Sequence, residues 1–172
     1  ADDLLAQYRF FLKDTIRKRI DFSRTAQSRG VAPPPIEKPV AAGAVLVDLP
    51  APLAGTGSAD LPLAAAIANR RSRRTYLNRS LPLEALSFLL WASQGIRAPV
   101  DGGHAYRTVP SAGCRHALET YLAVLNVDGV EQGLYRYLPL GHRLVFEHAE
   151  ERLAERLVAA AFGQPYPGKA AV

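Results

Sequence analysis

Three segments rich in β-branched and aromatic residues constrain the fold most strongly. They run from Thr120 to Val127, from Leu134 to Tyr137 and from Arg143 to Phe146. Short linkers separate them, and the first linker contains Asp128-Gly129, a dipeptide typical of tight hairpin turns. The pattern predicts an antiparallel meander of three strands.

Helical patterns flank these strands on both sides. Apolar residues at helical spacing predict helices over about residues 3–22 and 61–69, with Asp60 as the N-cap of the second. A third helix should follow Pro82 and end near Gly95, and a fourth should end before Gly163. Their apolar faces would consist of Leu83, Leu86, Leu89, Leu90 and Trp91, and of Leu153, Leu157, Val158 and Ala161. Helices before and after an antiparallel unit indicate the α+β class.

Proline and glycine divide the chain. The stretch from Ser28 to Pro39 contains three consecutive prolines and predicts an extended arm. A second loop, from Pro50 to Ser58, contains Gly55 and Gly57. We therefore expect residues 1–58 to form an N-terminal helix and arm, and residues 59–172 to form the main domain. With 172 residues and 48% hydrophobic content, one domain with a substantial core is expected.

The run Arg70-Arg71-Ser72-Arg73-Arg74 directly follows the second predicted helix. A guanidinium group presents a planar fork of donors that suits phosphate, and a serine adds a short hydroxyl donor. The run therefore predicts an anion site. Its residues alone do not decide between a nucleic acid backbone, a lipid headgroup and a cofactor.

The sequence Pro110-Ser111-Ala112-Gly113 forms the second candidate site. It should be a turn that presents backbone and hydroxyl donors and leads into a short helix through His116 and Leu118. Cys114 would lie at the start of that helix, where backbone donors lower the pKa of a thiol. No base in a recognisable motif accompanies it, so we do not assign a nucleophile.

Several functional classes find no support in the sequence. The net charge is +5, but outside the arginine run the basic residues are dispersed, and no nucleic-acid-binding motif is present. Neither glycine-loop motif for nucleotides occurs, and the four histidines lack the paired spacing of metal ligands. No apolar run reaches the ~20 residues that span a membrane. With a single cysteine and an acidic start, the chain is expected to be cytoplasmic. The absence of methionine suggests that Ala1 is not the translated start.

Four segments, taken in order, resemble one family. They are Arg70 to Tyr76, Leu81 to Gly95, Arg107 to Gly113 and Gly133 to Tyr137. Together they resemble the SagB-type branch of the nitroreductase superfamily, whose founding members oxidise azolines in peptide maturation. The resemblance covers roughly residues 60 to 165. It implies a nitroreductase-like α+β fold, with helices packed on an antiparallel sheet, that normally continues past Val172, so the domain would be incomplete at its C-terminus.

The resemblance also implies a cofactor, FMN, bound at the interface of a homodimer with shared sites. By this likeness, Arg70, Arg71, Ser72 and Arg74 would contact its phosphate, ribityl chain and pyrimidine edge, and Arg73 would point away. Pro110, Ser111, Ala112 and Gly113 would reach the flavin of the partner subunit. The implied reaction is ping-pong hydride transfer from a donor such as NADH or NADPH, or from a peptide substrate, without an assigned catalytic acid or base.

Two other functions stay open from the sequence. The chain could be a noncatalytic half-domain that keeps the fold and binds a partner protein or peptide, or that a second polypeptide completes. The arginine run could instead bind a polyanion, with an affinity that falls steeply as salt increases.

Overall fold

The computed structural model describes residues 2–53, 61–101 and 103–172. Two compact units, Ala1–Pro34 and Pro35–Val172, are described separately below. The sequence placed a boundary near residue 58, whereas the second unit of the structure begins at Pro35, because the segment that follows is bonded to the sheet. The expected N-cap Asp60 and the loop glycines Gly55 and Gly57 lie outside the described residues.

The first unit contains a shorter helix than the sequence predicted. The α-helix α1 spans Asp2–Leu12, and two 3₁₀ turns follow it, η1 over Asp14–Arg19 and η2 over Phe22–Arg24. The backbone of Lys13, between α1 and η1, is extended with φ −89° and ψ 133°, so the single helix expected over 3–22 is wrong. Asp14 and the β-branched Thr15 and Ile16 are weak helix formers, and the apolar side chains of α1 are exposed, so no packing lengthens the helix.

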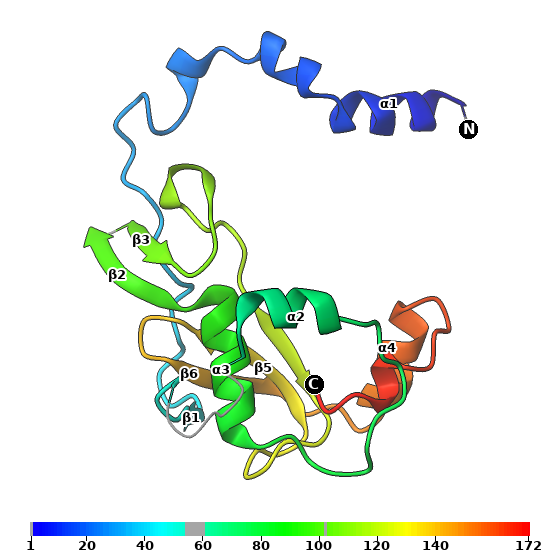
Figure 1. Cartoon of the computed structure of the whole chain (residues 1–172). Coiled ribbons are helices and arrows are strands. Elements are labelled where there is room, and N and C mark those ends of the chain that lie inside the picture. Colours follow the sequence, from blue (N-terminus) through cyan, green and yellow to red (C-terminus); the bar gives the residue numbers. More distant parts are fainter. Residues whose placement is uncertain (1, 54–60, 102) are drawn as a thin grey trace. The chain divides into compact units, whose positions relative to one another are not determined.

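A four-stranded antiparallel sheet forms the centre of the second unit (Figure 1). Its strands are β1 (Leu46–Asp48), β4 (Tyr121–Val124), β5 (Gly133–Leu138) and β6 (Arg143–His148), in the spatial order β1-β6-β5-β4. The predicted meander is confirmed. Strand β1 was not predicted, since its three residues are too short to show an alternating pattern.

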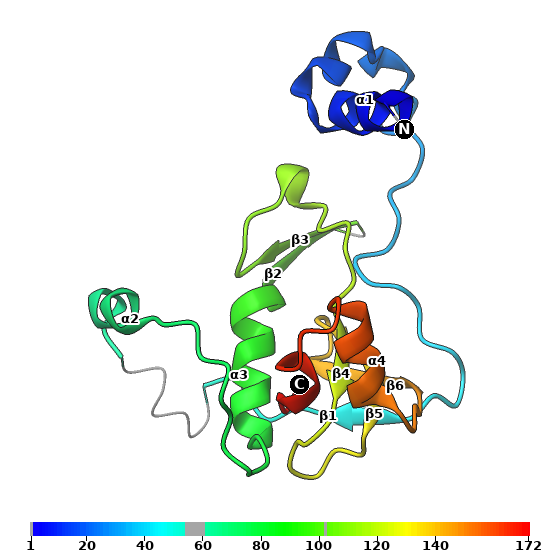
Figure 2. The same cartoon turned by 90° about the vertical axis from the view of Figure 1, so that its right-hand side faces the viewer.

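The helix α3, Leu83–Gln94, covers one face of this sheet (Figure 2). Leu86 and Leu90 pack into the core with buried residues of the strands, namely Leu122, Val124, Tyr135, Tyr137 and Leu144. Leu89, which the sequence placed on the apolar face, is exposed instead. The helix ends as predicted at Gly95, where a Cβ atom would come within 2.4 Å of the Trp91 side chain. Helices with an antiparallel sheet confirm the α+β class.

Two more helices, a 3₁₀ turn and a hairpin also belong to this unit. Helix α2 spans Leu63–Asn69, helix α4 spans Leu153–Ala160, and a 3₁₀ turn η5 spans Pro167–Lys169. A separate hairpin joins β2 (Ile96–Asp101) to β3 (His104–Arg107). The sequence reading missed this hairpin because a proline inside a strand argues against strand structure. Among the described residues, no helix is long and apolar enough to cross a membrane.

Candidate functional site

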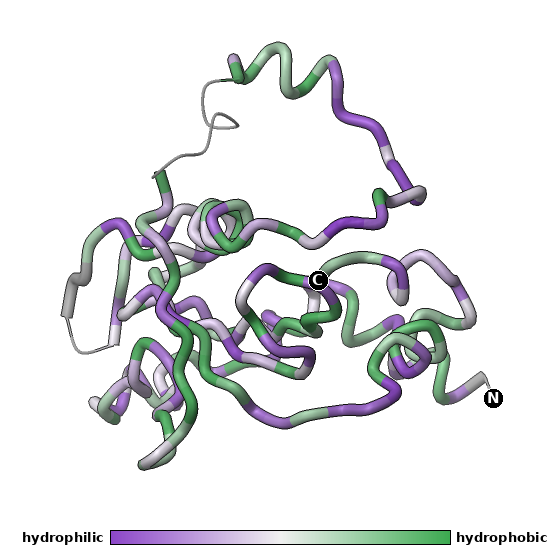
Figure 3. Tube along the Cα trace, turned by 90° about the horizontal axis from the view of Figure 1, so that it is seen from below, coloured by the Kyte–Doolittle hydropathy of each residue, from purple (hydrophilic) through white to green (hydrophobic). Residues whose placement is uncertain are grey.

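The arginine segment, residues 70–74, follows α2 as expected and has no regular secondary structure. All five of its residues are exposed. Figure 3 shows the trace change from mostly hydrophobic in α2 to strongly hydrophilic here. The guanidinium carbon of Arg74 lies 5.3 Å from the centre of the Tyr166 ring, a cation–π distance. The segment thus presents a row of cationic donors to solvent, with Arg74 held against an aromatic ring.

A cleft lies beside this segment, and we call it the arginine-side cleft. It consists of two cavities of about 220 and 450 Å³ that share Tyr76, Leu77, Asn78 and Lys169. Arg74 lines the larger cavity and Arg79 the smaller one, and none of the lining residues is acidic. The cleft is therefore cationic, with amide and aromatic groups between its charges.

Sequence reasoning did not identify Lys169 as part of this cleft. The backbone N–H groups of Leu125 and Asn126 donate to the Ala171 carbonyl at 2.9 and 3.0 Å, which fixes the segment that carries it. At Gly168 an added Cβ would meet the Ala154 carbonyl oxygen at 2.7 Å, so η5 packs closely on α4. Lys169 lines the same cavity as Arg74 because of this tertiary packing, and no local sequence pattern predicts that position.

The Pro110–Gly113 turn follows β3 and ends in a short 3₁₀ turn, η4, at Ala112–Cys114. Gly113 has φ +65° and Cys114 φ +54°, left-handed values that prevent helix continuation. The helix expected through His116 and Leu118 is therefore wrong, and Leu118 is exposed. The Oγ atom of Ser111 accepts the His116 N–H at 2.9 Å, so its own hydroxyl proton is available to another acceptor.

A cavity of about 690 Å³ adjoins this turn, and we call it the turn-side cavity. Its lining includes Trp91, Tyr106, Arg97 and Arg107 together with Ser111, Cys114 and His116. Burial lowers the pKa of His116, and the positive charge of Arg107 lowers it further. His116 is therefore biased toward the neutral imidazole, and the fixed charges in the lining are the two arginines.

None of the cavities described above is lined by residues of both sequence-predicted sites. Arg74 lines the arginine-side cleft, whereas Pro110 and Ser111 line the turn-side cavity.

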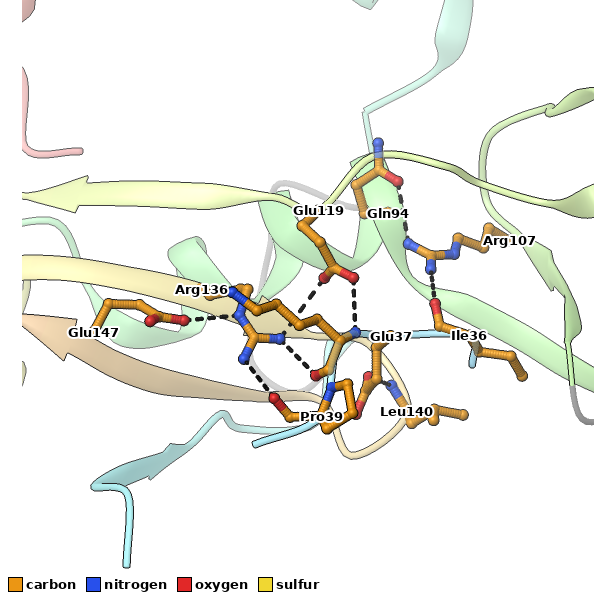
Figure 4. Close-up of polar contacts among 10 residues, drawn as sticks. Ile36, Glu37, Pro39, Gln94, Arg107, Glu119, Arg136, Leu140 and Glu147 are labelled. Carbon is orange, nitrogen blue, oxygen red and sulfur yellow. Dashed lines mark hydrogen bonds and ion pairs between the residues drawn. The ribbon is translucent and has the colours of Figure 1, made fainter. Parts of the chain in front are cut away.

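Two buried arginines tie the segment after Pro35 to the sheet and hairpin (Figure 4). Arg136, on β5, donates to the Lys38 carbonyl at 2.8 Å and the Pro39 carbonyl at 3.3 Å, and pairs with Glu147 at 2.8 Å. Arg107 donates to the Ile36 carbonyl at 3.1 Å. Only 3% of the Arg136 side chain is exposed. These contacts explain why residues 36–48 belong to the main domain.

Ser87, His142 and Tyr137 form a hydrogen-bonded chain that resembles a nucleophile with its base. The Ser87 hydroxyl donates to the Pro50 carbonyl at 2.6 Å, so its oxygen accepts from Nε2–H of His142 at 2.7 Å. The Tyr137 hydroxyl then donates to His142 Nδ1 at 2.8 Å. Ser87 is fully buried, so a substrate cannot reach its oxygen. The chain of bonds is structural, and it requires a neutral imidazole.

This network predicts acid sensitivity of folding. Burial lowers the pKa of His142 below its ordinary 6.5, and the Pro50 carbonyl opposes this only in part. As the pH falls, the unfolded chain therefore takes up a proton on this histidine before the folded chain does. The stabilisation of the folded state is present above about pH 6.5 and is lost as the pH falls from there toward the lower pKa of the folded state. Urea unfolding at about pH 7.5 and about pH 5.5 measures the loss. The loss should be smaller in His142→Asn, which also tolerates the left-handed φ of +49°. An equal loss in both proteins would contradict the assignment.

The described residues contain no group of three histidine, cysteine or carboxylate side chains placed to hold a metal ion. Cys114 has a free thiol and is partly buried in the turn-side cavity. The chemistry that this part of the molecule offers is therefore that of cationic, hydroxyl and aromatic groups.

The model of the nitroreductase family matches residues 67–170, which is more than half of the chain and includes the arginine segment, the turn and the strands β4, β5 and β6. The chain belongs to the nitroreductase family. It is 36% identical over 107 residues to a protein of Methanocaldococcus jannaschii named as a candidate nitroreductase, in an alignment that covers 62% of this chain and 52% of that protein.

A crystal structure of a candidate nitroreductase from Ralstonia eutropha JMP134 is similar to this family member at 31% sequence identity and a TM-score of 0.49. The match covers 69% of this chain and 53% of that structure. The chain thus spans about half the length of each of these two relatives.

Proposed function

We propose that this chain is an FMN-dependent oxidoreductase of the nitroreductase family, of the SagB type. The observation that carries the proposal is the exposed arginine segment beside a cleft without acidic lining residues, within the span that matches the family. A flavin phosphate carries negative charge and needs guanidinium or ammonium partners. Arg70, Arg71 and Arg74 are candidates for this role, and Lys169 lines the same cavity as Arg74.

The residues of both candidate sites fit FMN by their chemistry. Arg70, Arg71 and Ser72 are exposed donors for the phosphate and ribityl chain, and Arg74 is the cation for the pyrimidine edge. A cation at that edge stabilises the negative charge that develops on two-electron reduction. When bound, FMN supplies hydride chemistry between a donor and an acceptor.

The turn provides the second set of contacts. Pro110, Ala112 and Gly113 are exposed and are small or rigid, which suits close approach of backbone to a flat ring, and Ser111 has a hydroxyl proton to donate. The separation of the turn from the arginine segment supports a homodimer in which each flavin touches both subunits. In this arrangement, one chain holds the phosphate and the partner covers the ring.

Titration of the purified protein with FMN tests the proposal. We expect saturable binding with one flavin per chain, measured by flavin fluorescence quenching and by equilibrium dialysis. Gel filtration of the loaded protein should give a dimer. A protein that binds no FMN at any concentration, or only when a second polypeptide is added, would contradict the proposal for this chain and favour the noncatalytic half-domain.

Turnover experiments test the proposed ping-pong mechanism and the electron donor. In a ping-pong reaction, NADPH or NADH reduces the bound flavin without any acceptor present, and an acceptor reoxidises it in a separate step. Anaerobic stopped-flow absorbance resolves the two steps. If neither nucleotide reduces the flavin, a peptide substrate becomes the electron donor to test, as the SagB type implies.

A further inference from the structure

Arg107 is a buried cation whose donors are incompletely satisfied. Arg107 is 7% exposed, and its Nε is buried and has no hydrogen-bond partner among the residues that the structure describes. One of its other bonds, from Nη1 to Gln94 Oε1, is long at 3.4 Å. Burial lowers the pKa of Arg107, which means that its charge is destabilised where it lies.

Carboxylates near Arg107 do not satisfy it by direct pairing. Glu119 and Glu37 raise its pKa through their charge. Their oxygens are bonded elsewhere, Glu119 to the backbone N–H of Lys38 at 2.7 Å and Glu37 to that of Leu140 at 2.9 Å. The protein's own carboxylates therefore stabilise the Arg107 charge only by long-range attraction. An anion in the adjoining cavity would stabilise it by direct pairing.

The turn-side cavity supplies the rest of a binding site. Its volume of about 690 Å³ lies within the usual range for small-molecule pockets. Trp91 and Tyr106 offer aromatic surface, Arg97 adds a second guanidinium, and none of the lining residues that the structure describes is acidic. Guanidinium groups favour carboxylate or sulfonate oxygens, and aromatic walls favour a flat ring.

We infer that the turn-side cavity binds an aromatic ring carrying an anionic group, held by Arg97 and Arg107, as the second substrate of the flavin reaction. That the ligand is a substrate rests on the proposed function, which assigns the adjoining turn to the flavin ring. It assigns a different anion to each site: the cofactor phosphate to the arginine-side cleft, and the substrate's charge to the turn-side cavity.

Trp91 lines the cavity and is the only tryptophan in the sequence, so its fluorescence reports on occupancy. The protein is titrated with 4-nitrobenzoate and with 4-nitrobenzamide, a neutral ring of the same shape. We expect 4-nitrobenzoate to bind at least tenfold more tightly, the equivalent of about one charge-assisted hydrogen bond.

Variants assign the difference to the cavity. Arg97→Gln removes an exposed guanidinium and should weaken 4-nitrobenzoate binding about tenfold while leaving 4-nitrobenzamide binding unchanged. Arg152→Gln removes an arginine that pairs with Glu155 on the surface, outside the cavity lining, and should change neither.

Equal affinity for the two ligands, or equal effects of the two variants, would overturn the inference. Ribose 5-phosphate carries the same kind of phosphate group as FMN and serves as the competitor. If it displaces 4-nitrobenzoate, the inference is overturned as well, because the cavity would then be the phosphate site. Discrimination between the ligands in a protein that binds no FMN would leave the anion site standing and refute the proposed function instead.

Discussion

Replacing Arg136 with methionine should lower the free energy of unfolding by about 3 kcal/mol. The change removes the bonds to the Lys38 and Pro39 carbonyls and the ion pair to Glu147. The loss lies at the lower end of the range for a broken buried pair, because Glu119 and Glu147 are 29% and 30% exposed and remain partly hydrated. Urea unfolding followed by circular dichroism measures it.

Arg152→Met is the matched control for this prediction. Arg152 pairs with Glu155 on the surface, and its side chain is 75% exposed. Water replaces such a pair at little cost, so the unfolding midpoint should stay within experimental error. If Arg136→Met shifts the midpoint no more than this control does, the buried cluster does not stabilise the fold as we describe.

Changing both Arg70 and Arg71 to glutamine should produce the largest loss of FMN affinity. Each charged hydrogen bond to a phosphate contributes about 1.5–3 kcal/mol, so each single variant should raise the Kd for FMN roughly tenfold to 100-fold, and the double variant more. Both residues are exposed, which means that the fold should tolerate the changes. Fluorescence titration with FMN at constant ionic strength measures the Kd.

Arg73→Gln separates a specific site from general attraction. It removes the same charge from the same segment, at a position whose side chain should point away from the flavin according to the family resemblance. We expect an effect of less than about twofold, due only to the long-range field. Equal losses for Arg73→Gln and Arg71→Gln would indicate a diffuse polyanion surface, and the affinity would then fall steeply with salt.

Local patterns predicted most of the second unit's regular structure. Hairpin chemistry at Asp128-Gly129 located the meander, and the termination of α3 at Gly95 and of α4 before Gly163 followed from glycine positions. Strand β1 needed β6 beside it, since Leu46 and Val47 pair with Val145 and Leu144, and no local signal marks so short a strand. The helix over 3–22 failed for the opposite reason, because its local pattern exists without packing to support it.

The candidate site divides in the same way. The arginine segment and the Pro110–Gly113 turn are contiguous motifs, so residue chemistry and order were enough to single them out. Lys169 and Arg107 were not singled out as site residues, because their roles depend on which distant segments pack beside them. Lys169 lines the same cavity as Arg74 because η5 packs on α4, and Arg107 donates to a carbonyl 71 positions earlier, at Ile36.

The segment from Ile36 to Pro39 contributes to the domain through its main chain. Its carbonyl oxygens, not its side chains, are the acceptors for Arg107 and Arg136. Every amino acid supplies the same carbonyl, so substitutions at Ile36 or Lys38 keep these bonds as long as the backbone path is unchanged. Alanine at Ile36 or Lys38 would therefore leave these bonds in place, whereas alanine at Glu37 would remove a carboxylate that accepts the Leu140 N–H at 2.9 Å. The side chains at Ile36 and Lys38 can therefore vary while the same carbonyl oxygens accept from the two buried arginines.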